Sequence, residues 1–183
     1  MGIALVIVVA LAALLLFAAT RPGEFRVQRS VRIQAPPGRV FANLDDFRRW
    51  TAWSPWEGLD PELQRTFSGA ASGVGSVYEW QGNRKVGKGR MEITRSDTPG
   101  RLIIKLDFLK PFEAHNTAEF ALDPIADAQG EATQLTWSMH GPAPFVSKLM
   151  GIFVSMDKMI GKDFEAGLAK LKSVAEGPRA GGA

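Results

Sequence analysis

The chain has 183 residues, 45% of them hydrophobic, with a formal net charge of +3 and no cysteine. That length suits one domain with a sizeable core and hardly allows two. Its Lys and Arg residues are scattered rather than gathered into a stripe, which argues against nucleic-acid binding. Without cysteine there is no disulfide, thiolate nucleophile or cysteine-ligated metal, and 2 histidines are too few for a histidine-only metal centre. We therefore expect no metal and no other cofactor.

Residues 3–19 carry no charge and no strongly polar side chain. As a helix they would extend roughly 25 Å, near the lower limit for crossing a bilayer. We predict a single-pass anchor in the cell membrane over residues 1–20 and a linker over 21–24. A cleaved signal peptide is the main alternative, since Ala18-Ala19 suits processing, although no positive residue precedes the apolar run. A buried soluble helix is the third.

Arginines follow this segment and only the terminal amine precedes it. The positive-inside rule favours a cytoplasmic domain, but a folded domain of this size can be translocated against that rule. The sequence leaves the side of the membrane open.

Beyond the linker, alternating apolar and polar residues predict a series of antiparallel strands. The first is expected at 25–33, and short helical spacing follows it at 38–50. Further strands are expected at 63–67, 77–80, 86–94, 101–109, 112–122 and 133–140, with turns at 69–75 and 97–100 and a polar loop at 123–131.

From residue 144 to 174, apolar side chains recur every three to four positions, which predicts one long helix that Gly177-Pro178 ends. No other element is long enough to cover the apolar face of the sheet. The expected fold class is therefore α+β, a curved antiparallel sheet of about six to seven strands wrapped on a long C-terminal helix. We assign this domain to residues 25–176 and a disordered tail to 177–183.

The order of these elements resembles the START/Bet v1-like (SRPBCC) superfamily, and in particular its bacterial polyketide cyclase/dehydrase-like branch. The stretches that carry the resemblance are Ala35-Pro36-Pro37 with Val40-Phe41, Trp53-Ser54-Pro55-Trp56, Gly73-Val74-Gly75 before Tyr78-Glu79-Trp80, and Met156-Asp157-Lys158 with Phe164-Glu165. The resemblance covers residues 24–175 and implies a helix-grip fold around a cavity. The superfamily includes lipid carriers, hormone receptors and cyclases, so the resemblance fixes no reaction.

Strand alternation divides the polar residues between two faces. Asn116 shares a face with Phe120 and Leu122, so it should point inward, either to bind a ligand or to serve as a structural amide. The opposite, solvated face should carry His115, Glu119, Arg90, Glu92 and Asp107. The candidates for ligand binding are Trp53, Trp56, Tyr78, Trp80, Met91, Leu106, Asn116, Trp137, Met156 and Met159.

Several of these features have two interpretations. The tryptophans at 50, 53 and 56 suit either a lid over the cavity or simple packing, and the methionines of the long helix suit either a cavity lining or a core. Glycines at 151, 161 and 167 indicate either a close approach to the sheet or a ligand, or a weak helix. His140 suits the cavity mouth or an exposed or capping position.

No nucleophile elbow, phosphate loop or helical zinc motif occurs in the chain. The leading hypothesis is a membrane-anchored domain that binds a hydrophobic small molecule such as a lipid, an isoprenoid or a polyketide-like compound. One alternative is a cyclase- or dehydratase-like enzyme, with Tyr78 as the best single catalytic candidate. Another is an interaction module for an envelope protein, which a solid core would favour. The oligomeric state stays open.

Overall fold

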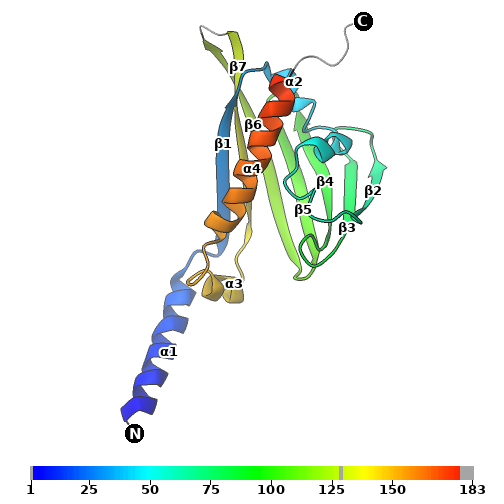
Figure 1. The fold of residues 1–183 in the computed structure, drawn as a ribbon. Coiled ribbons are helices and arrows are strands. Elements are labelled where there is room, and N and C mark those ends of the chain that lie inside the picture. The colour runs from blue at the N-terminus through cyan, green and yellow to red at the C-terminus, as the bar shows by residue number, and fades with distance from the viewer. Residues whose placement is uncertain (1, 128–129, 178–183) are drawn as a thin grey trace, which may run out of the picture.

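A computed structural model of the chain describes residues 2–127 and 130–177 (Figure 1). Seven antiparallel strands form one sheet in the order β1-β7-β6-β5-β4-β3-β2. The strands are β1 Glu24–Ile33, β2 Gln64–Gly69, β3 Ser76–Gln81, β4 Lys88–Asp97, β5 Arg101–Lys110, β6 Ala114–Asp127 and β7 Gly130–Pro142. The helices are α1 Gly2–Thr20, α2 Pro37–Phe41, the 3-10 helix η1 Phe47–Ala52, α3 Phe145–Met150 and α4 Met156–Glu176. The predicted fold class is confirmed, because α4 lies across the inner face of a curved antiparallel sheet.

The segment predicted as one helix over 144–174 is two helices, so that prediction was wrong. Gly151 caps the C-terminus of α3, and the side chain of Ser155 accepts a hydrogen bond from the Lys158 backbone N–H at 3.3 Å to start α4. Both are ordinary capping residues, and the apolar periodicity on either side outweighed them in the sequence. Residues 151–155 therefore form a bend that turns α3 away from the sheet.

The polar stretch 123–131 was predicted as a loop, but β6 continues to Asp127 and β7 begins at Gly130. Asp123 pairs with Gln134, and Ile125 pairs with Ala132. This end of the hairpin extends beyond the core, so few of its side chains are buried and no alternation marks the strand. The opposite error occurs at Phe112, which was placed inside a strand but lies in the β5–β6 turn with 82% of its surface exposed. Of the tail predicted at 177–183, residues 178–183 lie outside the described residues.

Helix α4 packs mainly along β1, and an arginine on the inner face of that strand holds it there. Arg29 occupies a position where its strand otherwise presents apolar side chains. Its guanidinium donates to Asp157 at 2.8 Å and to Glu165 at 2.7 Å, and these hydrogen bonds raise the pKa of Arg29. A Cβ at Gly161 would overlap this guanidinium, so glycine at the crossing lets Arg29 keep this position.

A second glycine of α4 allows close packing deeper in the core. A Cβ at Gly167 would lie 2.9 Å from Cδ of Pro55 and 3.1 Å from the ring of Trp137. Of the two interpretations of the helix glycines, close approach to neighbouring elements therefore applies at both positions.

Helix α1 leaves the domain at the end of the sheet where β1 begins (Figure 1). Its side chains are exposed apart from a few near its C-terminus, among which Ala18 is fully buried. By length and composition α1 could cross a membrane, a property that signal sequences near an N-terminus share.

Candidate ligand cavity

A cavity of about 1130 Å³ lies between the inner face of the sheet and helices α3 and α4. It exists because α4 packs along β1 rather than over β3 to β6, of which the short helices η1 and α2 contact β3 and β6 only in part. Strand alternation directs Met91 of β4, Leu106 of β5 and Met139 of β7 into this space. The walls are largely aliphatic and aromatic, the lining expected for a hydrophobic guest.

An aromatic cluster closes the end of the cavity away from α1. Trp137 stacks on Phe164 of α4, with ring centroids 3.9 Å apart and planes within 6°, and it stacks on Phe120 at 5.1 Å. Trp56 meets Trp137 edge-on at 5.8 Å. The indole N–H of Trp137 has no hydrogen-bond partner among the described residues, so packing alone fixes this ring. Such aromatic pairs contribute about 0.5–1.5 kcal/mol each beyond their buried area.

The tryptophans at 50, 53 and 56 were interpreted either as a lid over the cavity or as simple packing, and the structure divides them between the two. Trp50 donates its indole N–H to the Leu44 carbonyl at 2.9 Å, and Trp53 donates to the Asn43 carbonyl at 3.0 Å. Both rings are buried, and these bonds join η1 and its C-cap to the segment between α2 and η1. Trp50 and Trp56 line the cavity, whereas Trp53 does not.

One wall of the cavity carries a polar cluster in which Tyr78 is buried, Glu57 is half-buried and Arg65 is exposed. The Tyr78 hydroxyl donates to Oε1 of Glu57 at 2.9 Å, while Arg65 donates from Nε to Oε2 at 2.7 Å. Burial, and then the neighbouring Glu57 carboxylate, raise the pKa of Tyr78, so the phenol keeps its proton. The hydroxyl oxygen can still accept a hydrogen bond from a ligand.

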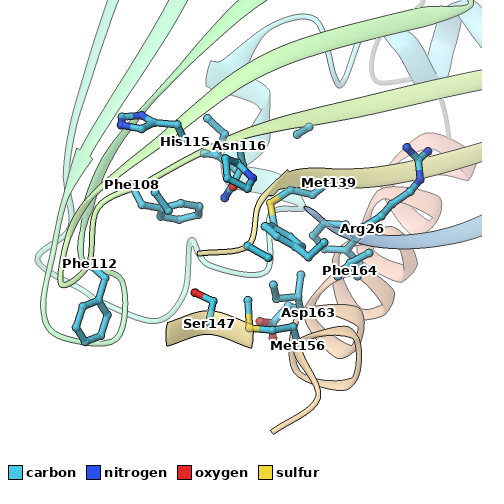
Figure 2. Close-up of a pocket in the computed structure, with 18 of the residues that line it drawn as sticks. Arg26, Phe108, Phe112, His115, Asn116, Met139, Ser147, Met156, Asp163 and Phe164 are labelled. Atoms are coloured by element: carbon cyan, nitrogen blue, oxygen red, sulfur yellow. The ribbon is translucent and has the colours of Figure 1, made fainter. Parts of the chain in front are cut away.

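Asn116 supplies a second polar point inside the cavity. The residue is 8% exposed, and its amide points into the cavity between Phe108 and Met139 (Figure 2). A Cβ at Gly141 would overlap Oδ1 of Asn116, so glycine in β7 makes room for the amide. Among the described residues it has no hydrogen-bond partner. An amide in this state can both donate to and accept from a ligand.

The mouth of the cavity lies beside α3 and the start of α4. Ser147, Met156 and Asp163 come together there, with Phe112 across the opening (Figure 2). Arg21 and Pro22, which directly follow α1, also border the cavity. The opening therefore faces the same end of the molecule as the apolar N-terminal helix.

Eight of the ten predicted ligand-binding residues line the cavity: Trp56, Tyr78, Trp80, Met91, Leu106, Asn116, Trp137 and Met156. Trp53 does not, because it is fully buried beneath the short helices. Met159 does not either, since it is 53% exposed on α4. Five residues separate it from Phe164, a rotation of roughly 140° around the helix away from the buried face.

The residue that sequence reasoning missed most clearly is Glu57. It follows Trp56 in a segment without periodicity. The only signal for an ion pair was Arg65, eight positions later in the next strand. Asp163 was also missed, because charged residues on a terminal helix are normally solvated. His140 is half-buried in β7 opposite Arg26, rather than exposed, capping or at the mouth.

The outer-face assignment by alternation holds, but one of its members is not solvated. Asp107 is 8% exposed and lies between Lys105 and His115, whose ring nitrogen is 2.7 Å from its carboxylate. Across residues 2–127 and 130–177, no group of three His, Asp or Glu side chains has a geometry that would hold a metal ion.

A family model described as polyketide cyclase / dehydrase and lipid transport matches residues 24–176. The chain is similar in structure to protein CV1439 from Chromobacterium violaceum, with 16% identity and a TM-score of 0.56, over 86% of this chain and 100% of that one. It is also similar to the di-domain ARO/CYC BexL from the BE-7585A biosynthetic pathway, with 14% identity and a TM-score of 0.59, over 88% of this chain and 53% of that one. Major latex-like protein 151 of Panax ginseng gives 14% identity and a TM-score of 0.55, over 84% and 99% of the two chains. At these identities the likeness concerns the fold alone. No curated protein matches the sequence.

Proposed function

The chain belongs to the polyketide cyclase / dehydrase and lipid transport family, and on that basis we propose that it is a membrane-anchored domain that binds a hydrophobic small molecule. A lipid, an isoprenoid or a polyketide-like compound would occupy the space between the sheet and helices α3 and α4. The observation that carries the proposal is the cavity of about 1130 Å³ with mainly apolar walls. Ligand sites commonly measure about 300–1,000 Å³, so this space suits a guest of lipid size.

The two polar points in the cavity suggest what kind of guest it takes. Asn116 offers an amide, and the Tyr78 hydroxyl, held by Glu57, offers an acceptor oxygen. A guest with an apolar body and one or two hydroxyl or carbonyl groups would satisfy both. A pure hydrocarbon would leave the amide of Asn116 unpaired, which costs about 1–3 kcal/mol.

The anchor is the second part of the proposal. The side chains of α1 are exposed along most of its 19 residues, and a soluble domain rarely presents so much contiguous apolar surface to water. A bilayer would cover it.

Native mass spectrometry of the full chain, extracted from its own membrane in nanodiscs, tests the binding proposal. We expect a co-purified mass that the Ala118→Phe variant carries at much lower occupancy, because Ala118 lines the cavity and a ring there would project into the space of the guest. Ala121→Phe, on the opposite face of the same strand, is the matched control and should retain the mass. If the wild-type chain and Ala118→Phe carry the same bilayer lipids and nothing else, the cavity does not bind a guest.

A second candidate function is a cyclase- or dehydratase-like reaction on the same guest, and the Glu57–Tyr78–Arg65 cluster is the observation that favours it. Tyr78→Phe should then retain the bound mass yet abolish turnover of a candidate substrate. Equal turnover by the variant would exclude Tyr78 from the reaction. A solid core would have favoured the interaction-module hypothesis, and the cavity removes that support.

A further inference from the structure

Large apolar side chains stand exposed around the cavity mouth, on three separate segments. They are Phe112 in the β5–β6 turn, Val146 and Met150 on α3, and Phe153 and Val154 in the bend before α4, with exposed fractions of 82%, 66%, 61%, 73% and 50%. We call these five residues the apolar rim. Single exposed apolar residues are common, but several gathered at one end of a domain are typical of a binding surface.

The apolar rim lies at the end of the domain from which α1 emerges (Figure 1). Helix α3 packs against the C-terminal part of α1, and Nη2 of Arg21 donates to the Gly151 carbonyl at 3.4 Å. Only residues 21–23 separate α1 from β1. Even fully extended, the step from Thr20 to Glu24 spans at most about 14 Å. An anchored domain would therefore hold its rim close to the bilayer surface.

Charged residues at the same end of the sheet are mainly basic. Strand register brings the β3–β4 turn next to the β5–β6 turn, where Lys88 faces Lys110. A hollow of about 280 Å³ is lined by these lysines together with Arg84. Arg21 and Lys148 add positive charge beside the rim, against the carboxylates of Glu24, Glu113, Asp157 and Asp163. Of these, Arg29 neutralises Asp157. A basic border around exposed apolar residues suits an anionic phospholipid surface.

We propose that the apolar rim inserts into the surface of an anionic bilayer, so that the cavity opens directly onto the lipid. This inference rests on the proposed function, because α1 must anchor the chain for the rim to reach the membrane. It goes further by assigning a role to residues outside the cavity and a route for the guest. An apolar guest would then pass between bilayer and cavity without crossing water, which avoids about 0.8 kcal/mol of exposure for each CH₂ group.

The natural chain has no cysteine, so single-cysteine variants of the full chain accept one environment-sensitive fluorophore each. We would label Phe112→Cys and Phe153→Cys at the rim, with Val74→Cys as the matched control. Val74 is also apolar and is 59% exposed, but it lies in the β2–β3 turn at the other end of the sheet. Each protein is reconstituted into vesicles of phosphatidylcholine with or without phosphatidylglycerol, some carrying nitroxide-labelled lipids. Vesicle flotation reports whether α1 anchors the chain.

We expect both rim labels to emit at shorter wavelength than the Val74 label in the same vesicles. We also expect nitroxide lipids to quench them about twofold or more above that control, most strongly with phosphatidylglycerol. Labelled protein that floats with vesicles but stays unquenched at the rim overturns the docking proposal and leaves ligand binding intact. Protein that fails to float overturns the anchor and the docking together. If both rim labels emit at shorter wavelength but nitroxide lipids do not quench them, a second protein copy covers the rim. That result would also overturn the proposal.

Discussion

The two ends of the sheet carry the same kinds of side chain, but one end buries them and the other exposes them. At the end away from α1, the rings of Trp53, Phe120, Trp137 and Phe164 pack against one another and are at most 3% exposed. At the end next to α1, Phe112 and Phe153 are 82% and 73% exposed beside an open cavity. Composition does not separate the two ends, because both are rich in aromatic and aliphatic residues.

The difference lies in what covers each end. Helix α4 is pinned along β1 by Arg29, and its middle part, with Phe164 and Gly167, packs on the aromatic cluster. The bend at residues 151–155 redirects α3 toward α1 before the helix can cover the other end. Stability is thus concentrated where the helix covers the sheet, and binding where it does not. Variants should divide in the same way.

The largest effect is expected from Phe164→Ala in the closed end. Phe164 is 1% exposed and stacked on Trp137, so its truncation should lower the free energy of unfolding by about 3–5 kcal/mol. Phe153→Ala is the matched control at the open end, where we expect a change within about 0.5 kcal/mol. Urea denaturation followed by tryptophan emission measures both. Similar losses in the two variants would erase the distinction between the ends.

A smaller loss is expected from Tyr78→Phe in the cavity wall between the two ends. The change removes one of the donors that hold the Glu57 carboxylate, and hydrogen bonds to charged groups contribute about 1.5–3 kcal/mol. Thermal unfolding with and without a bound guest measures the loss. If the guest's hydroxyl contacts Tyr78, the variant should also bind the guest more weakly. Unchanged stability would mean that Arg65 alone satisfies Glu57.

Sequence patterns predicted the parts of the fold that face a core. Alternation placed Met91, Leu106, Asn116 and Trp137 on the inner face, because those strands have one buried and one wet side. It failed where that asymmetry ends, as in the outer part of the β6–β7 hairpin, where both faces are exposed. It also failed at residues 151–155, where apolar residues continue in helical spacing while caps end the helix.

The site was predicted less fully than the fold for a related reason. Whether an inner-face residue lines a cavity or packs in a core depends on what lies above it, and that is decided by residues distant in sequence. Trp53 and Trp56 belong to one motif, yet only Trp56 reaches the cavity. Glu57 lies in a turn and acquires its role from Tyr78 of β3 and Arg65 of β2. No local pattern encodes such a cluster.

The pin between β1 and α4 can be tested with a pair of substitutions. Gly161→Ala should add about 1 kcal/mol of helix propensity, but its methyl group would displace the Arg29 guanidinium. We expect no net gain in stability from that variant alone. In an Arg29→Met background the propensity gain should reappear, giving a coupling of about 1 kcal/mol in a double-mutant cycle. Additive effects would show that Arg29 is free to move aside and does not fix the helix.

The smallest effect is expected on the outer face at the open end. There the His115 ring lies beside the carboxylates of Asp107 and Glu113, and Asp107 also pairs with Lys105. The hydrogen bond with Asp107 raises the pKa of His115 above its unfolded value of about 6.5. Burial opposes the ionisation of Asp107, but the hydrogen bonds from His115 and Lys105 outweigh it and lower the pKa of Asp107.

Because the folded His115 holds its proton more tightly, its contribution is complete below about pH 6.5 and is lost as the pH rises through the folded pKa. In that window the wild type should lose stability relative to His115→Gln, as measured by urea denaturation at a series of pH values. Asp107→Asn should remove the same slope, since an amide does not stabilise the imidazolium. The rim is untouched in both variants, so vesicle binding should not change. If both variants keep the wild-type slope, the dependence comes from elsewhere, and the outer face at the open end contributes as little to pH-dependent stability as the apolar rim beside it.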